Sequence, residues 1–426
     1  MPPRAKKSSE NSDSGNPFSL PNSDFSLPLP AQVPKLRFSE FRGEGLRSVQ
    51  LGDVTEEGRS RNGQKHTVAS VMGVTKVDGI VPMEARLIAA DIARYKLVQK
   101  DWFAYNPMRL NIGSIARWKG ESEILVSPDY VVLKCLTDDE PGIDPVYLDH
   151  FRQTKAWEAF VTEGGDGSVR VRIYYRDLAR LRLAVPSIAE QQKIAECLSS
   201  VDELIAAQAR KLDALKTHKK GLMQQLFPRE GETQPRLRFP EFQNAGEWVV
   251  KAVGDVFKVT RGEVLSMTLV ADEPSGDAPY PVYSSQTKNK GLAGYYSDYL
   301  YQDAITWTTD GANAGDVNFR PGKFYCTNVC GVLINTDGQA NVCIAALLNS
   351  VTRGHVSYVG NPKLMNGVMA KIEIPFPCVE EQQRIADCLT SLDDLVAAQN
   401  QTLEALKTHK QGLMQQLFPI PSQSEI

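Results

Sequence analysis

The side chains best suited to chemistry are amides, hydroxyls and cations on three stretches that each contain a glycine or end beside one. These are Tyr105–Ile115, Tyr283–Lys290 and Thr308–Gly315. Asn and Gln can bond adenine bidentately, Arg and Lys can bond guanine, and Ser or Thr suit bases or phosphates. Such loops predict surfaces that read DNA bases. The structural alternative stays open, because Asn-x-Gly is first of all a turn sequence.

The candidate DNA-contacting residues share a polar or charged side chain, and all except Lys76 lie in or near these loops. They are Lys76, Asn106, Arg109, Asn111, Ser114, Arg117, Ser284, Ser285, Gln286, Lys288, Lys290, Thr309, Asp310 and Asn313. The net charge of −3 argues mildly against nucleic-acid binding, since such binders are often basic. The local distribution of charge matters more than the sum.

Motifs for catalysis are missing from the sequence. Asn106-Pro-Met-Arg109 lacks the second proline and the aromatic residue of an amino-methyltransferase tetrapeptide. Gly322-Lys323 is followed by Phe324 rather than by the Ser or Thr of a phosphate loop. Cys326, Cys330 and Cys343 form the only cysteine cluster, and the first two have no histidine at ligand spacing, so we expect buried free thiols and no metal. The chain is expected to have no catalytic residue and to bind no cofactor.

The chain is expected to be cytoplasmic. Its seven cysteines show no regular pairing, which favours a reducing compartment. No apolar run reaches the ~18 residues of a membrane span. Residues 1–33 are rich in Ser, Pro and Asn, lack the apolar core of a signal peptide, and are expected to be disordered.

One segment occurs twice, at an offset of 191 residues. Residues 186–228 and 377–419 are identical at 29 of 43 positions. The short motif at 34–41 returns at 235–242, and Asn111-Ile-Gly113 returns as Asn313-Ala-Gly315. The parts between these repeats are unlike. The pattern predicts a tandem duplication in which a common frame carries two divergent readers.

The expected fold class is α+β, with two mixed α/β domains separated by two long helices. The predicted parts are a tail at 1–33, a first recognition domain at 34–185, a central helical region at 186–228, a second recognition domain at 235–376 and a C-terminal helical region at 377–419. Short β-like runs broken by Gly, Pro and Asn dominate both variable parts. Ser187-Ile-Ala-Glu190 has the form of a capping box at the start of the first helix.

Apolar residues alternate at spacings of four and three through both helical repeats, which predicts a coiled coil. The expected seam consists of Ile194, Leu198, Val201, Ile205, Gln208, Leu212, Leu215, Leu222 and Leu226 in the first helix, and of Ile385, Leu389, Leu392, Val396, Gln399, Leu403, Leu406, Leu413 and Leu417 in the second, with Lys219 and Lys410 at the remaining positions. Two separately buried helices are the alternative. If a two-fold axis relates the halves, the helices are antiparallel and Gln208 can meet Gln399.

These motifs together resemble the specificity (S) subunits of type I restriction–modification systems. The similarity rests on Glu190-Gln-Gln-Lys-Ile-Ala195 and its copy, on Leu222-Met-Gln-Gln-Leu-Phe-Pro228 and its copy, on the loop at 105–114, and on Thr309-Asp-Gly-Ala-Asn313, Thr327-Asn-Val-Cys-Gly331 and Pro362-Lys-Leu-Met-Asn366. It covers residues 34–419. Each motif is weak alone, and the combination is specific.

The resemblance implies a non-catalytic DNA reader whose two domains each recognise one half of a split, asymmetric site. The helix pair would set the unread spacer and dock two methyltransferase subunits, which carry S-adenosylmethionine, and restriction subunits would join for cleavage. A structural coiled-coil scaffold, or a DNA-binding regulator with two readers and no restriction role, is the alternative. A fused enzyme would need a catalytic motif that the sequence does not contain.

Overall fold

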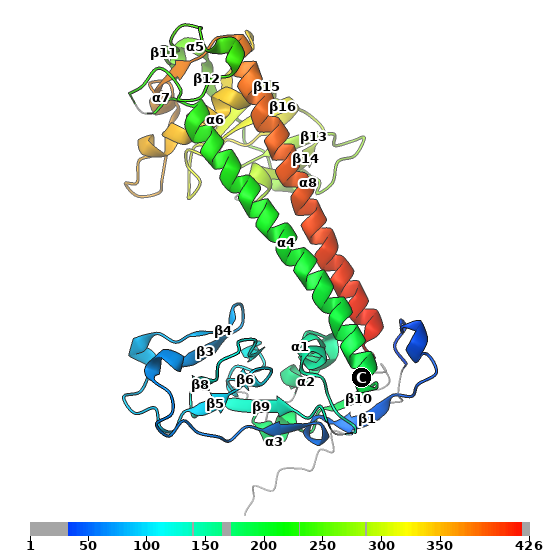
Figure 1. Cartoon of the computed structure of the whole chain (residues 1–426). Helices are drawn as coiled ribbons and strands as arrows, with labels where there is room; N and C mark the ends of the chain where they lie inside the picture. The colour runs from blue at the N-terminus through cyan, green and yellow to red at the C-terminus, as the bar shows by residue number, and fades with distance from the viewer. Residues whose placement is uncertain (1–32, 139, 164–171, 230, 286–287, 420–426) are drawn as a thin grey trace, which may run out of the picture. The chain divides into compact units, whose positions relative to one another are not determined.

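The computed structural model describes residues 33–138, 140–163, 172–229, 231–285 and 288–419 (Figure 1). The chain divides into two compact units, each with one variable region and part of each long helix. The first unit takes the chain up to Val201 and from His409 onward, and the second takes Asp202–Thr408. The tail expected at 1–33 lies outside the described residues except for Val33.

A pair of antiparallel strands closes each unit next to a long helix. In the first unit β1 (Arg47–Gln50) pairs with β10 (Arg182–Val185), which leads into α4 (Ile188–Leu226). In the second unit β11 (Val249–Ala252) pairs with β18 (Glu373–Phe376), which leads into α8 (Val379–Leu417). The strands that begin and end each variable part therefore belong to the repeated frame.

Two equivalent glycines tighten this frame. Gly52 donates its N–H to the carbonyl of Ala179, and Gly254 donates to the carbonyl of Ala370, both at 2.9 Å. A Cβ on Gly52 would lie 2.9 Å from the Cβ of Ala179, which is too close for two carbon atoms. This close approach explains why Gly-Asp-Val occurs at the same place in both halves.

The variable part of the first unit is built on an antiparallel sheet of order β2-β9-β6-β7. Its elements are β2 (Thr55–Glu57), β3 (Met72–Thr75), β4 (Gly79–Pro82), β5 (Lys96–Val98), β6 (Phe103–Tyr105), β7 (Ile115–Arg117), β8 (Ile124–Val126), β9 (Val131–Cys135), α1 (Pro145–Phe151), α2 (Lys155–Glu163) and α3 (Tyr175–Leu178). β3 pairs with β4 and β5 with β8 as separate two-stranded sheets. Asp144 caps α1 by accepting from the N–H groups of Val146 and Tyr147.

The second variable part is built on a six-stranded sheet of order β12-β17-β15-β16-β13-β14. Its elements are α5 (Val253–Val256), β12 (Lys258–Arg261), β13 (Tyr280–Tyr283), β14 (Leu292–Tyr296), β15 (Tyr301–Thr308), β16 (Val317–Cys326), β17 (Cys330–Ile334), α6 (Val342–Val351) and α7 (Asn366–Met369). β13 and β16 pair in parallel, and the other pairs are antiparallel. The mixed α+β class predicted for both parts is confirmed.

The long helices pair antiparallel. Within the second unit, Gln208 Nε2 donates to Gln399 Oε1 at 2.7 Å, and Lys219 Nζ lies 2.5 Å from Asp393 Oδ1. Residue numbers therefore rise along α4 as they fall along α8. The predicted meeting of Gln208 with Gln399 is confirmed. A polar pair on an apolar seam costs some stability and fixes one register.

Each unit packs part of both long helices into its own core. In the first unit Ile194 and Leu198 share an apolar cluster with Leu417 and Phe418. In the second unit Leu226 and Phe227 share a cluster with Ile385 and Leu389. All the expected seam positions are buried or half-buried, while most other positions along the middle of the helices are exposed. The heptad pattern therefore marks the faces that pack, as expected for a coiled coil.

A buried ion pair joins each lead-in motif, which is residues 34–41 in the first unit and 235–242 in the second, to the start of a long helix. Arg37 binds both carboxylate oxygens of Glu190, with a distance of 2.8 Å from Nε to Oε1. Arg238 binds Glu381 through Nε and Nη2 at 2.8 and 2.7 Å. The capping box expected at Ser187 and Glu190 is therefore wrong, because Arg37 holds the Glu190 carboxylate and the Ser187 hydroxyl donates to Glu44.

Candidate nucleic-acid interface

The first candidate loop connects β6 to β7 and is closed by its own hydrogen bonds. Asn106 Oδ1 accepts from the N–H of Met108 at 3.0 Å, and the carbonyl of Arg109 accepts from the N–H of Ser114 at 3.0 Å. Leu110 anchors the loop because its side chain is buried in the core. Arg109 and Asn111 are exposed. The loop thus presents a cation and an amide on a fixed backbone.

Ser114 and Arg117 turn into the protein. The Ser114 hydroxyl is buried and donates to the carbonyl of Val74 at 3.0 Å. The Arg117 guanidinium forms ion pairs with Asp101 and with Asp149. We therefore assign both residues to the support of the loop, which corrects the expectation that they lie on its surface.

Lys76 lies beside this loop although 30 residues separate it from Asn106. It occupies the turn between β3 and β4 and is exposed. Its Cγ lies 3.3 Å from the point where a Cβ on Gly113 would be. Gly113 has a φ of 92°, so the backbone there also favours glycine. The structure therefore brings Lys76, Arg109 and Asn111 to the same part of the first unit.

The second candidate loop connects β15 to β16. Thr309 is buried, and its hydroxyl lies 3.0 Å from the carbonyl of Val329 and 2.8 Å from Asp310. Asp310 lies 3.7 Å from Lys363 Nζ in an ion pair. Both candidate residues therefore have partners within the unit. Thr309 lies beneath the loop and stabilises it, and it does not form part of the loop's exposed surface.

The loop after β13 meets the loop after β15. Asn313 Nδ2 donates to the carbonyl of Ser285 at 3.2 Å, and Ser284 Oγ lies 3.0 Å from Thr327 Oγ1. Lys290 is exposed and has a positive φ of 53°. Gln286 and the side chain of Lys288 lie outside what the structure describes. The structure thus brings Ser284, Ser285, Lys290 and Asn313 together, a proximity that the sequence did not predict.

Arg320 stabilises the loop that carries Ser284, Ser285 and Lys290, and sequence reasoning missed this residue. Its guanidinium lies 3.7 Å from the centroid of the Tyr283 ring and donates to the carbonyl of Lys290 at 2.6 Å and to Thr306 Oγ1 at 3.0 Å. Burial lowers the pKa of Arg320, because it penalises the charged form. A small cavity beside it is lined by Ser284, Lys290 and Asn313 among others.

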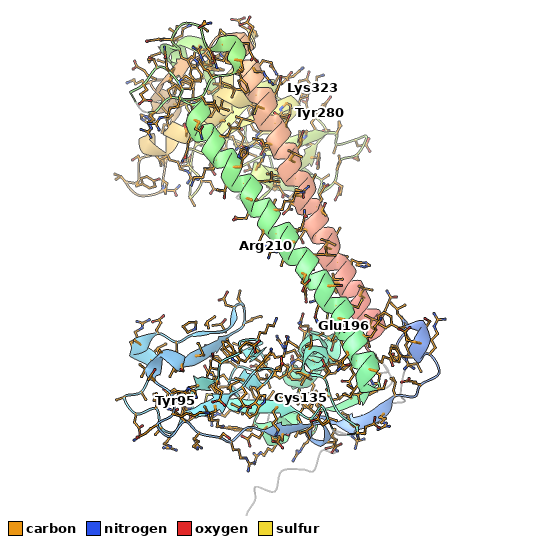
Figure 2. All side chains as sticks on the ribbon, viewed as in Figure 1. Tyr95, Cys135, Glu196, Arg210, Tyr280 and Lys323 are labelled. Atoms are coloured by element: carbon orange, nitrogen blue, oxygen red, sulfur yellow. The ribbon has the colours of Figure 1, made fainter. Side chains whose placement is uncertain are left out.

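Lys323 of this unit lies beside two tyrosines, Tyr280 and Tyr299. Figure 2 labels Tyr280 and Lys323 on the second unit. Lys323 Nζ lies 4.4 Å from the centroid of the Tyr299 ring, and the Tyr280 and Tyr299 rings are 5.0 Å apart. Nothing in the sequence pointed to Lys323, Tyr280 or Tyr299, since neither a lone lysine nor scattered tyrosines form a motif.

The cysteines offer no metal centre. Among the described residues, no group of three His, Cys, Asp or Glu side chains is placed to hold a metal ion. Cys326, Cys330 and Cys343 are buried free thiols. Burial raises the pKa of Cys330 to about 11, so its thiol stays protonated near neutral pH. No helix in the described part of the chain combines the length and apolarity that a membrane crossing requires.

The chain is similar to a set of known proteins. Residues 245–408 match the family model for the type I restriction modification DNA specificity domain. A type I specificity subunit of Mycoplasma pneumoniae is 32% identical over 223 residues, which cover 51% of this chain and 83% of that protein. The specificity subunit of the type I restriction enzyme MjaX from Methanocaldococcus jannaschii is 26% identical over 349 residues, covering 77% of this chain and 80% of that protein.

Two solved structures share the fold. The S subunit of a type I restriction–modification system from M. genitalium is 14% identical with a TM-score of 0.61, covering 91% of this chain and 99% of that one. A chain from a study of complex assembly in the type I system is 17% identical with a TM-score of 0.53, covering 89% and 98%. From its relatives, its repeated frame and its fold, the chain belongs to the specificity subunits of type I restriction–modification systems, which are non-catalytic and carry DNA recognition.

Proposed function

We propose that the two units each read one half of a bipartite, asymmetric DNA site, and that the helix pair sets the unread spacer. The observation that carries this proposal is the repeated frame with two unlike sets of loops. Structurally equivalent closing strands, glycines and buried ion pairs hold both variable parts, so the frame supplies the same support twice. Different loops on equal supports are suited to different half-sites.

The polar groups on the candidate loops of each unit suit base and phosphate contacts. Arg109, Asn111 and Lys76 in the first unit can donate to guanine, adenine and phosphate respectively. Ser284, Ser285, Lys290 and Asn313 supply hydroxyl, amide and cationic groups in the second unit. Phosphate contacts would position each unit, and base contacts would supply the sequence preference.

We propose that the helix pair also docks two methyltransferase subunits. Leu204 on α4 and Leu395 on α8 occupy equivalent positions of the repeat and are 57% and 50% exposed. An exposed apolar residue repeated on both helices suits one copy of a partner for each helix. These subunits would bring S-adenosylmethionine and the adenine-methylating chemistry, restriction subunits would join for cleavage, and the complex would work in the cytoplasm.

Mapping methylated adenines in a host that expresses this chain with its methyltransferase tests the proposal. We expect one split sequence with a fixed gap, methylated in both halves. A continuous site, or methylation that does not depend on this chain, would contradict it.

Exchanging one variable part should change one half-site only. We expect replacement of residues 43–185 by the corresponding part of another specificity subunit to alter the first half-site and leave the second and the gap unchanged. The reason is that each variable part is held by its own strands, glycine and ion pair. The reciprocal control replaces residues 243–376, and a simultaneous change of both half-sites in either chimera would refute independent recognition.

Replacing Arg109 by Ala should weaken binding of the assembled complex to its site by about 1–3 kcal/mol if Arg109 bonds a guanine bidentately. Titrations against the matched site and against sites with single substitutions would then show relaxed preference at one position. A phosphate contact predicts equal weakening on all sequences and a shallower salt dependence. The exposed Arg42, which directly follows the lead-in motif at 34–41, provides the matched control. Unaltered affinity and specificity in a normally folded variant would remove Arg109 from the surface.

A further inference from the structure

Two valines are more exposed than any other large apolar side chain that the structure describes. Val77 in the first unit is 87% exposed, and Val359 in the second is 92% exposed. Both lie at the tip of a short hairpin. Single exposed apolar residues are ordinary on proteins, so their meaning depends on what surrounds them.

The hairpin of Val77 is packed directly on the first candidate loop. It consists of β3 and β4, and its turn is closed by the Asp78 N–H, which donates to Thr75 Oγ1 at 2.9 Å. The Ser114 hydroxyl bonds Val74 in β3, and the side chain of Lys76 lies against Gly113. The tip therefore lies beside the loop that carries Arg109 and Asn111, on a hairpin that this loop holds at β3 and at Lys76.

The hairpin of Val359 is packed in the same way on the second candidate loop. Ser357 and Lys363 exchange two backbone hydrogen bonds of 2.9 Å, and Gly360 turns the chain with a φ of 76°. Gly311 donates to the carbonyl of Pro362 at 2.9 Å, and Lys363 pairs with Asp310. The neighbouring Tyr358 is 69% exposed.

The two hairpins come from different places in the two variable parts. The first precedes its Asn-x-Gly loop along the chain, and the second follows its loop by more than 40 residues. They are therefore not a remnant of the duplication. Both hairpins have a supported base, an apolar tip and a position beside a candidate loop. A shared role in binding the same kind of ligand would explain these three features together.

We propose that Val77 and Val359, the latter with Tyr358, are apolar contacts to DNA bases, one at each half-site. This inference rests on the proposed role of the adjacent loops, because it places the tips in the groove that those loops read. Two kinds of base contact suit an aliphatic tip on a rigid support. One is packing on the C5-methyl group of thymine in the major groove. The other is a wedge against a base step in the minor groove.

The test uses the complete complex of this chain with its methyltransferase and duplexes carrying the mapped site. Val77→Ala and Val359→Ala each remove two methyl groups, and we expect each to weaken binding roughly tenfold. Val68→Ala and Val249→Ala, which alter valines 55% and 57% exposed away from the tips, are the matched controls. Thermal melts and the subunit ratio on size exclusion should match the unaltered complex.

Two further arms identify the kind of contact. Replacing one thymine at a time by deoxyuridine should reproduce the loss in the unaltered complex and add nothing to the matching variant if the tip packs on a methyl group. A wedge instead predicts no deoxyuridine effect, together with brighter 2-aminopurine fluorescence at one step that disappears in the variant. Either result supports the proposal.

Other outcomes overturn it. Binding by Val77→Ala and Val359→Ala equal to that of their controls would remove the tips from the interface. Loss of methyltransferase from the complex would assign the tips to protein assembly. Normal binding by the tip variants beside weakened binding by Arg109→Ala would leave the loops in place and reject the tips alone. Weakened binding by the tip variants beside normal binding by Arg109→Ala would retain the tips in the interface and reject Arg109.

Discussion

A heptad inserted at matching places in both long helices should lengthen the gap between the two half-sites by about three base pairs. The insertion points are between Ala206 and Lys211 in α4 and between Ala397 and Thr402 in α8. Seven residues add ~10 Å of helix, and one turn of DNA of ~34 Å holds about ten base pairs. A whole heptad returns every seam residue to the packed face, so the pairing survives.

Both half-sites should keep their sequences in this variant, since neither variable part is altered. Three base pairs also rotate the second half-site by roughly a third of a turn, so we expect slower methylation than in the unaltered complex. The methylation map measures both the sequences and the gap. A heptad inserted in α4 alone is the control, and it should disrupt assembly because Gln208 can no longer meet Gln399. An active double-insertion variant with an unchanged gap would contradict the ruler proposal.

Much of the frame could be predicted because its sequence occurs twice in the chain. The seam pattern is regular over nearly five heptads, and a two-fold relation between the repeated halves predicts an antiparallel pair in which Gln208 can meet Gln399. Local rules also placed the helix ends, because proline follows Phe227 and Phe418. Periodicity and repetition are properties of neighbouring residues, which is why sequence alone carried this part.

The buried ion pairs and the residues that support the loops could not be predicted, because their partners lie far apart in the chain. Arg37 and Glu190 are 153 positions apart, and Glu190 was expected to serve as a helix cap. The recurrence of this Arg and this Glu at equivalent positions in both halves could have indicated an ion pair. Nothing in the sequence showed that the two residues contact each other. Arg320 and Ser114 gave no such signal. A polar residue in a loop has the same sequence signature whether it turns outward or holds the loop from beneath.

Replacing Glu381 by Ala should destabilise the second unit by about 3–5 kcal/mol, the usual cost of removing one partner from a buried ion pair. The Glu381 carboxylate accepts two bonds from Arg238 and a third, of 3.1 Å, from Trp248 Nε1. The side chains of Arg238 and Glu381 are only 10% and 1% exposed. Without the carboxylate, a buried guanidinium and a buried indole N–H lose their acceptor.

Hydrogen exchange followed by mass spectrometry can measure this change separately in each unit. We expect faster exchange in β11, β18 and the start of α8, with β1 and β10 unchanged. Glu190→Ala should give the mirror result, because Glu190 holds Arg37 in the first unit. Glu404→Ala is the matched control, since its pair with Lys407 is exposed and such pairs contribute only about 0.3–0.5 kcal/mol. If Glu381→Ala exchanges like Glu404→Ala, the ion pair does not fix the lead-in motif to the helix, and the frame must be held by its strands and apolar core alone.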